Sequence, residues 1–271
     1  MTHACSLWES PRRNDITMGI LSKLYFSAAG AVKRLTGKVA PTLYMEETEQ
    51  HFADVFGFEL NDTRVFHELM SDIVHIDIHI VPPDENRPFY LLFTTGMSDK
   101  PMMLPEECTW DERKIHERAE VYCLLPPDWK FEKFADRDEE KRYMWVISVL
   151  KQIARYPHMC QSCLGNMHSL QFTEENTPFA DNTGFCSAVF LTSDGRDFGG
   201  KYGDRLGYFR TEDGSYINLL CFIPMYEDEM NFKIEKGGNE LFLKLFGETV
   251  TDFSQLIINV NRESVCMNKC I

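Results

Sequence analysis

Residues 73–129 constrain the fold of this chain more than any other stretch. They contain three apolar runs, which read IVHIDIHIVPP, FYLLFTTGMS and ERAEVYCLLPPDW. Each run is rich in β-branched, aromatic or other large apolar residues, and each is closed by a turn signal with Gly or Pro. We therefore expect three strands here, and a sheet as the centre of the domain.

The first run carries polar side chains at alternate positions. Successive side chains of a strand point to opposite faces, so His75, Asp77 and His79 share one face and the aliphatic residues between them share the other. Imidazole and carboxylate ligands suit zinc or iron. However, positions i, i+2 and i+4 spread over about 13 Å of strand, so three such side chains rarely reach one ion. We interpret them as a polar, hydrogen-bonded sheet face and expect no metal.

An enzyme remains the alternative interpretation of this face. A metal-dependent hydrolase could use His75, Asp77 and His79, with a further ligand from His158 or His168. Elemental analysis of protein purified without added metal distinguishes the two interpretations, because a metalloenzyme would retain a stoichiometric ion.

The net charge limits the class of partner. The 271 residues carry a formal charge of −14, so a phosphate backbone would be repelled and a basic protein segment attracted.

No apolar run approaches the roughly 18–20 residues that cross a bilayer. The nine cysteines are odd in number and several lie in apolar runs, as buried free thiols do. We expect a cytoplasmic protein with a protein partner, no nucleic acid, no transmembrane segment and no disulfide framework.

The N-terminal residues differ from the rest in charge. Residues 16–45 contain no Asp or Glu but four cations, and apolar residues recur at roughly helical spacing over 20–35. We interpret 1–45 as a basic amphipathic extension, a helix laid on an acidic domain. A membrane-peripheral adaptor that docks weakly on a membrane surface through residues 16–38 stays open, as does a start at Met18.

Further elements follow from periodicity and turn signals. We expect helices over 46–56, ended by Gly57, and after DRDEEKR, where Tyr143, Ile147, Leu150 and Ala154 share a face and Tyr156-Pro157 ends the helix. We also expect strands over 184–192 and 215–224, a long hairpin loop over 193–215, a helical stretch over 226–246 interrupted by Gly237-Gly238, and a weakly ordered tail over 260–271.

The order of these elements indicates the fold class. Strands and helices are interspersed without strict βαβ alternation, which favours an α+β fold with a mixed β-sheet flanked by helices. No linker separates two domains, so we assign a single domain to 46–250 and a tail to 251–271.

Motifs for chemistry are incomplete. The pair Cys160-x-x-Cys163 follows a helix instead of opening one, and its potential partner pair Cys266-x-x-x-Cys270 lies in the predicted tail. The sequence GMSDK has Lys100 where a nucleophile elbow needs glycine. The glycine-rich stretch has neither phosphate-loop pattern. We therefore expect no catalytic residues and no cofactor.

Seven segments in the same order nevertheless resemble the suppressor of fused family. They are VHIDIHIVPP, YLLFTTGMS, ERAEVYCLLPPDW, IARYPH, the loop around Leu164-Gly165 and His168-Ser169, PFADNTGF, and INLLCFIPMYEDEMNFKIEKGGNELF. The family's usual Gly-His-Thr is Met167-His168-Ser169 here. The resemblance implies a single α+β domain that binds protein without catalysis, of the short bacterial type. Bacterial members are thought to act largely as immunity proteins that neutralise toxins, which implies a cognate toxin, here one with a basic domain, as the partner.

The resemblance also implies structural or partner-binding roles for a set of motif positions. Of these we expect Gly96 to adopt a positive φ, Arg118 and Glu120 to share a strand face and to pair with polar groups such as Asp77, and Trp129 to cap the core edge. The complete set is His75, Asp77, Gly96, Met97, Ser98, Glu117, Arg118, Glu120, Trp129, His158, Gly165 and His168.

Overall fold

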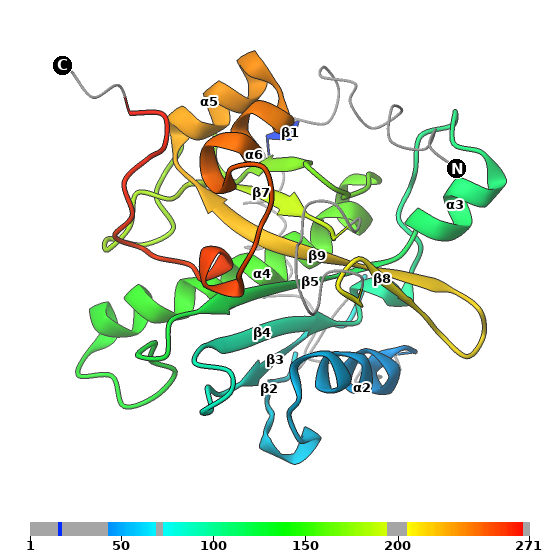
Figure 1. Ribbon diagram of the computed structural model, residues 1–271, viewed down its shortest axis with the longest axis horizontal. Coiled ribbons are helices and arrows are strands. Elements are labelled where there is room, and N and C mark those ends of the chain that lie inside the picture. The colour runs from blue at the N-terminus through cyan, green and yellow to red at the C-terminus, as the bar shows by residue number, and fades with distance from the viewer. Residues whose placement is uncertain (1–15, 18–42, 69–72, 194–204, 268–271) are drawn as a thin grey trace, which may run out of the picture.

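A nine-stranded mixed sheet organises the chain (Figure 1). The computed structural model describes residues 16–17, 43–68, 73–193 and 205–267. The strands are β1 Ile16–Thr17, β2 Arg64–Phe66, β3 Asp77–Val81, β4 Tyr90–Thr95, β5 Ala119–Leu125, β6 Ser169–Gln171, β7 Ser187–Leu191, β8 Tyr208–Arg210 and β9 Tyr216–Met225. The helices are α2 Met45–Phe56, α3 Trp110–His116, α4 Arg137–Cys160, α5 Glu227–Lys236 and α6 Gly238–Phe246, with 3-10 turns η2 Leu60–Asp62, η3 Met97–Asp99 and η5 Phe253–Leu256.

The sheet consists of two halves joined by a single parallel pairing. Its order is β1-β6-β7-β9-β5-β4-β3-β2, with β8 added to β9. The pairs β5–β9 and β1–β6 are parallel and the others are antiparallel. Strand β5 pairs with β9 only over its first four residues, where Ala119 lies opposite Asn218 and Tyr122 opposite Cys221. The predicted α+β fold with a mixed sheet flanked by helices is confirmed.

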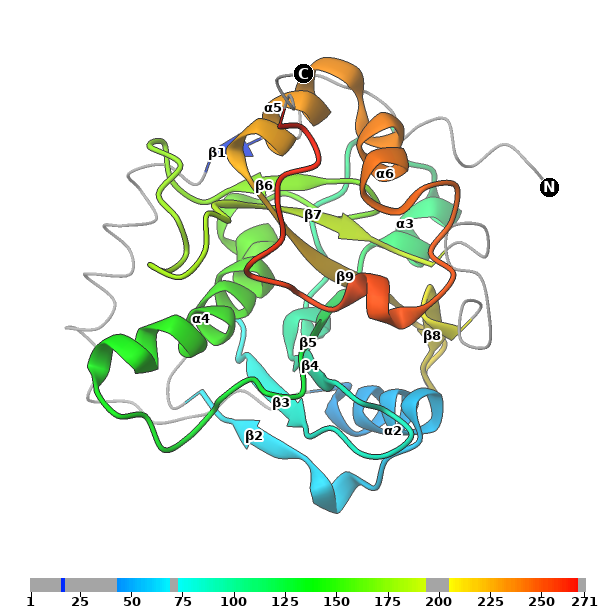
Figure 2. The same ribbon diagram turned by 60° about the vertical axis from the view of Figure 1, so that its left-hand side comes forward.

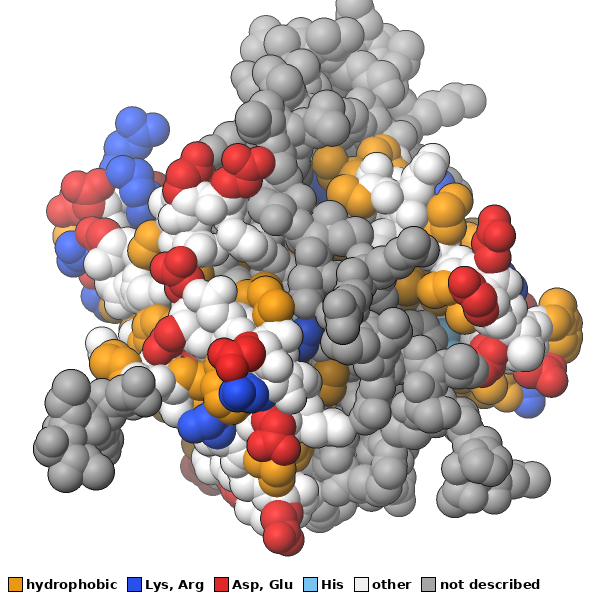
Figure 3. Space-filling view, turned by 90° about the horizontal axis from the view of Figure 1, so that it is seen from above, with side chains coloured by type: hydrophobic (Ala, Val, Ile, Leu, Met, Phe, Trp, Pro, Cys, Tyr) orange, Lys and Arg blue, Asp and Glu red, His pale blue; other side chains and the backbone are white. Residues whose placement is uncertain are grey.

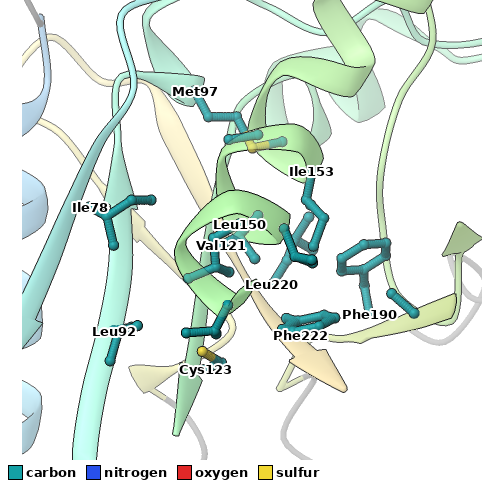
Figure 4. Close-up of a cluster of buried hydrophobic side chains, with 14 of the residues drawn as sticks. Ile78, Leu92, Met97, Val121, Cys123, Leu150, Ile153, Phe190, Leu220 and Phe222 are labelled. Carbon is teal, nitrogen blue, oxygen red and sulfur yellow. The ribbon is translucent and has the colours of Figure 1, made fainter. Parts of the chain in front are cut away.

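Helices lie over both faces of the sheet (Figure 2), and each face carries a buried core. On one face alternate residues of β3, β4, β5 and β9 form a core with α4. Figure 4 shows Leu150 and Ile153 of α4 beside Val121 and Leu220 of the sheet. On the other face Phe93 and Tyr122 form a second core with α2, α6 and the C-terminal segment. Because each fully buried large apolar side chain contributes roughly 1.5–3 kcal/mol, these two cores dominate stability.

Helix α4 runs beyond the predicted stop at Pro157. Its N-cap Asp136 accepts from the N–H groups of Asp138 and Glu139, and it ends only at Gln161, whose φ is 50° and whose N–H bonds the Pro157 carbonyl. The prediction at Tyr156-Pro157 is wrong because tertiary burial of both residues compensates for the preference of a pre-proline residue against helix. The predicted common face is confirmed, since Ile147, Leu150 and Ala154 are buried.

The two other predicted helical stretches have close to the expected extent. Helix α2 covers the predicted 46–56 and ends at Gly57, whose φ is 70°. The predicted stretch 226–246 is divided into α5 and α6 at Gly237. In both places glycine adopts a backbone conformation that other residues rarely enter.

The predicted first strand and the predicted long loop need correction. Strand β3 begins only at Asp77, because the segment before it turns to meet residues 67–68 through side-chain contacts. The predicted hairpin loop over 193–215 contains β8, which pairs with β9 through Phe209 opposite Ile217. Phe209 is buried, so apolar burial makes a strand within a glycine-rich sequence. Residues 194–204 of that loop lie outside the described residues.

The C-terminal segment is attached to the domain as far as Val265. The N–H of Ile258 bonds the Leu124 carbonyl at 2.9 Å, at the edge that β5 exposes where β9 diverges from it. Arg262 and Val265 bond the carboxylate of Glu229 on α5. Residues 262–265, which the sequence placed in a weakly ordered tail, thus contact α5, while 268–271 lie outside the described residues.

The N-terminal predictions fall almost entirely outside the described residues. Only 16–17 and 43–45 of the predicted extension 1–45 are described, and the backbone of β1 pairs with β6. The amphipathic helix, the start at Met18 and the membrane-docking alternative are not covered. The domain boundaries at residues 45 and 250 stay predictions. Within the described ranges, none of the helices is both long and apolar enough to traverse a bilayer.

Candidate functional site

Six of the predicted motif positions converge where β4, β5 and α4 meet. Gly96, with a φ of 98°, turns the chain from β4 into η3, which confirms the positive φ expected there. The first residues of β5 and the last turn of α4 lie next to this turn. We call this set the motif hub, and it comprises Gly96, Met97, Ser98, Arg118, Glu120 and His158.

Glu120 is the centre of the motif hub. Its side chain is completely buried. One carboxylate oxygen accepts from the Ser98 N–H at 2.9 Å and from the Ser98 hydroxyl at 2.6 Å. The other accepts from the Thr94 hydroxyl at 2.6 Å. A buried carboxylate is tolerated only with such partners, so Glu120 ties the end of β4 and the start of η3 to β5.

Burial raises the pKa of Glu120 to about 7, although the hydrogen bonds from Ser98 and Thr94 oppose the shift. The site can also accommodate the protonated acid. The Thr94 oxygen already accepts from the Val121 N–H at 2.8 Å, and its hydroxyl lies 3.3 Å from the Val121 carbonyl. If Thr94 donates to that carbonyl, its oxygen can accept the carboxyl proton. A shifted carboxyl of this kind is often catalytic, but the Glu120 side chain is not accessible to a substrate.

Arg118 closes the motif hub on the other side of η3. Its Nη1 donates to the Ser98 carbonyl at 2.6 Å, and its guanidinium lies 5.3 Å from the centre of the Tyr44 ring. The carboxylate of Glu117 lies 4.0 Å from its Nε. The expected pairing of Arg118 or Glu120 with Asp77 is wrong, because both side chains turn toward η3.

His158 connects α4 to the same turn. Its Nε2 lies 2.9 Å from the Met97 carbonyl, and burial lowers the pKa of its imidazole. A neutral ring that donates to the carbonyl fits this environment. Trp129 lies apart from the motif hub at the core edge, buried, with its indole N–H donating to the Tyr143 carbonyl at 3.1 Å, as expected of a core-edge cap.

His75 and Asp77 belong to a second, neighbouring polar group. Asp77 Oδ1 lies 2.9 Å from His75 Nε2 and accepts from the Glu68 N–H at 2.9 Å, while its Oδ2 lies 3.0 Å from His67 Nδ1. Glu68 in turn accepts from the Ile76 N–H at 3.0 Å and forms an ion pair with Arg155 of α4. These contacts hold the approach to β3 against α4.

His79 is separated from that pair and faces α2. Its ring stacks on Phe93 with centroids 4.6 Å apart, its Nε2 lies 2.9 Å from the Thr95 hydroxyl, and its Nδ1 lies 3.1 Å from Glu49. The three residues thus contact different neighbours, and no group of three His, Cys, Asp or Glu side chains in the described ranges could hold a metal ion. Among the described residues, the side chains named for the hydrolase alternative therefore do not converge on one point.

Gly165 and His168 form a separate loop beside β7. The His168 N–H bonds the Gly165 carbonyl at 3.1 Å, and the His168 carbonyl accepts from Phe190 at 3.0 Å. The nearby Cys160 and Cys163 are free thiols whose pKa values are raised by burial, that of Cys163 to about 11. A raised pKa disfavours the reactive thiolate at neutral pH.

Sequence reasoning missed Tyr44 and Thr94. The Tyr44 hydroxyl donates to Asp213 at 2.9 Å, and its ring lies beside Arg118, so it joins α2 to the turn before β9. Thr94 is part of the segment FTTGMS, and its polar side chain inside a buried strand was the available signal. The sequence contained no comparable signal at Tyr44, because the residues that Tyr44 contacts are distant along the chain.

The motif hub joins the two ends of a segment that leaves the sheet. Residues 101–117 leave the sheet after η3 and return at β5, and we call them the α3 arm. The motif hub joins the two ends of the arm through Arg118 and Ser98, and the Met102 N–H bonds the Glu117 carbonyl at 2.6 Å. These contacts hold the α3 arm in one position at the protein surface.

This α+β fold also occurs in solved structures. The structure of a Sufu–Fu complex matches with a TM-score of 0.56 and 14% identity, over 83% of this chain and 93% of that chain. A suppressor of fused homologue from Neisseria gonorrhoeae FA 1090 matches with a TM-score of 0.55 and 14% identity, over 83% and 98%. Drosophila Suppressor of Fused matches with a TM-score of 0.51 and 15% identity, over 80% of this chain but 50% of its own.

The sequence itself shows the family. The model of the Suppressor of fused protein (SUFU) family matches residues 72–263, which is most of the chain. This chain therefore belongs to the SUFU family, as the resemblance of its segments indicated. A comparison with curated proteins found no match.

Proposed function

We propose that this chain is a non-catalytic protein-binding module of the cytoplasm, and that it acts as an immunity protein that neutralises a cognate toxin by stoichiometric binding. The observation that carries the proposal is the use of the polar motif residues. Glu120 accepts hydrogen bonds from Ser98 and Thr94, and Arg118 donates to the Ser98 carbonyl. Polar residues arranged in this way hold the surface segment beside them, here the α3 arm, in place.

Family membership and charge support the same conclusion. One similar structure is a complex of Sufu with Fu, and another is a bacterial homologue that this chain covers over 98% of its length. The formal charge of −14 favours a basic partner, because complementary charge accelerates association and disfavours other partners. A basic toxin domain fits this requirement.

Co-purification from the native cell tests the proposal. The tagged chain should recover one protein in equimolar amount, and that protein should inhibit growth when it is expressed alone. Recovery of the chain by itself, with no toxin gene beside its own, would contradict the proposal.

Stoichiometry separates binding from catalysis. Titration of the purified toxin with this chain should abolish toxicity at a ratio near one to one, because each molecule neutralises one toxin. An enzyme that modifies the toxin would complete the inactivation at a small fraction of that ratio, given time. The second result would sink the non-catalytic part of the proposal.

A further inference from the structure

The α3 arm exposes a large aromatic side chain outside both cores. Trp110, the first residue of α3, is 73% exposed, and Met103 on the same arm is 57% exposed. The Lys114 ammonium lies 5.5 Å from the centre of the Trp110 ring. An exposed indole contributes little to folding, whereas Trp is the residue most enriched among the energetic centres of protein interfaces.

The arm that carries this indole is rigid. Thr109 and Glu112 form a reciprocal capping box at the start of α3. The Arg113 guanidinium donates to the carbonyls of Pro105 at 2.6 Å and Cys108 at 3.2 Å. The helix is thereby fixed to the turn before it, although it has only seven residues.

Contacts with the body of the protein fix the arm as a unit. The Met103 N–H bonds the Ser162 carbonyl at 3.1 Å, and Asn218 of β9 donates to the Ile115 carbonyl at 2.6 Å. Leu104 is buried in the core beneath. With the motif hub closing its base, the arm is held to the body of the protein near both of its ends. A preorganised surface loses little conformational entropy on binding.

The surroundings of Trp110 are acidic. The arm carries five carboxylates against two cations, which leaves three negative charges without counting His116. Glu106, Glu107 and Asp111 are exposed. On the side where α3 lies, Figure 3 shows hydrophobic surface beside carboxylates. An apolar centre with an acidic rim complements a basic surface that has an apolar pocket.

From this geometry we infer that the α3 arm is the partner-binding surface of this chain, with Trp110 as its anchor, and that the partner is a protein with a basic rim around an apolar pocket. The inference rests on the proposed function, whose binding surface it specifies. The motif hub then has a functional meaning, because it fixes the base of the arm.

The test uses the protein recovered with the wild-type chain as its probe. This probe is purified, labelled and titrated with each variant. Trp110→Ala should raise Kd by at least about 30-fold, as expected for an interface anchor, and Trp110→Phe should restore most of the affinity. The matched control is Leu60→Ala on η2, which removes another exposed apolar side chain, 41% exposed, and should change Kd by less than about threefold.

Charge reversal tests the rim separately. The double variant Glu106→Lys, Glu107→Lys should lower the association rate constant and weaken its dependence on salt, because the rim attracts the partner before contact. Glu140→Lys on α4 makes a charge change outside the arm and should have a smaller effect per charge. Thermal unfolding midpoints equal to that of the wild type show that the variants are folded.

The outcomes distinguish the two proposals. If the wild-type chain recovers no protein, the proposed function fails and the inference fails with it. If a protein is recovered and Trp110→Ala leaves its Kd within threefold, the inference alone is overturned. A wild-type dimer that Trp110→Ala dissociates in sedimentation would also overturn it, because the occupant would be a second copy of this chain.

Discussion

The guanidinium of Arg262 meets the carboxylate of Glu229 through two nitrogens, at 2.5 and 2.6 Å. Glu229 is completely buried at the start of α5, and the guanidinium lies 4.9 Å from the ring centres of both Phe185 and Tyr226. This pair attaches the C-terminal segment to the domain. It joins α5 to a part of the chain in which the sequence showed no periodicity.

We expect Arg262→Ala to destabilise the protein by about 3–5 kcal/mol, because it leaves a buried carboxylate without its charged partner. Urea unfolding measures this loss. The control is Lys141→Ala, which removes an ion pair in which both side chains are 74% exposed and should cost less than about 1 kcal/mol. Equal effects of the two variants would show that the C-terminal segment does not stabilise the domain.

Glu120 should make stability depend on pH. Burial raises its pKa in the folded protein to about 7, above the 4.5 of an exposed glutamate. Between these values the folded state binds more protons than the unfolded state, so stability falls as pH rises through this window and is level above it. The loss between pH 4.5 and pH 7 amounts to about 3 kcal/mol.

Glu120→Gln should remove this dependence. The amide can donate to the Thr94 oxygen in the same way as the protonated acid, so the variant should unfold at a higher temperature than the wild type at pH 8 and show a smaller advantage at pH 5. Calorimetry at both values measures the difference. Glu140→Gln, at an exposed position of α4, is the control. A variant that is less stable than the wild type at pH 8 would contradict the assignment.

Two glycines should respond differently to the same substitution. At Gly207 an added Cβ would lie 2.1 Å from the Ser193 carbonyl oxygen, so the backbone itself must move. At Gly57, with a φ of 70°, a Cβ meets nothing within 4 Å and only the left-handed conformation is strained. We expect Gly57→Ala to cost about 1 kcal/mol and Gly207→Ala at least twice that. The ranking in chemical denaturation checks this, and the reverse order would refute it.

Thiol labelling should follow burial. Cys163 is 5% exposed and its pKa is raised to about 11, whereas Cys160 is exposed. Iodoacetamide at pH 7.5 should therefore modify Cys160 in the folded protein and Cys163 only after unfolding. Peptide mass spectrometry reports each site. Rapid modification of Cys163 in the native protein would show that the loop after α4 opens.

Local sequence patterns predicted the elements whose structure depends on residues close together in the chain. The apolar runs of β4, β5 and β9 are recognisable because both faces of these strands are buried. Gly57 and Gly237 end helices through their own backbone freedom. In the same way Gly96 revealed the turn into η3. These features depend on a few neighbouring residues, so a single sequence contains the information.

Contacts between distant residues decided the rest. His79 and Asp77 are two residues apart, yet His79 meets Glu49 of α2 and Asp77 meets His67, so periodicity alone could not separate them. The end of α4 beyond Pro157 and the attachment of Arg262 have the same origin. Burial in the folded domain compensates for a locally unfavourable residue or orders a polar segment.

The sequence by itself determined that this chain is an α+β protein of the SUFU family, because apolar periodicity and family motifs are written in consecutive residues. Only the tertiary structure decided what those motifs do. Glu120, Ser98 and Arg118 come from two segments separated by the α3 arm, and they make a base for it only when the sheet brings the end of β4 beside the start of β5. In that arrangement Glu120 accepts hydrogen bonds from Ser98 and Thr94, and Arg118 donates to the Ser98 carbonyl.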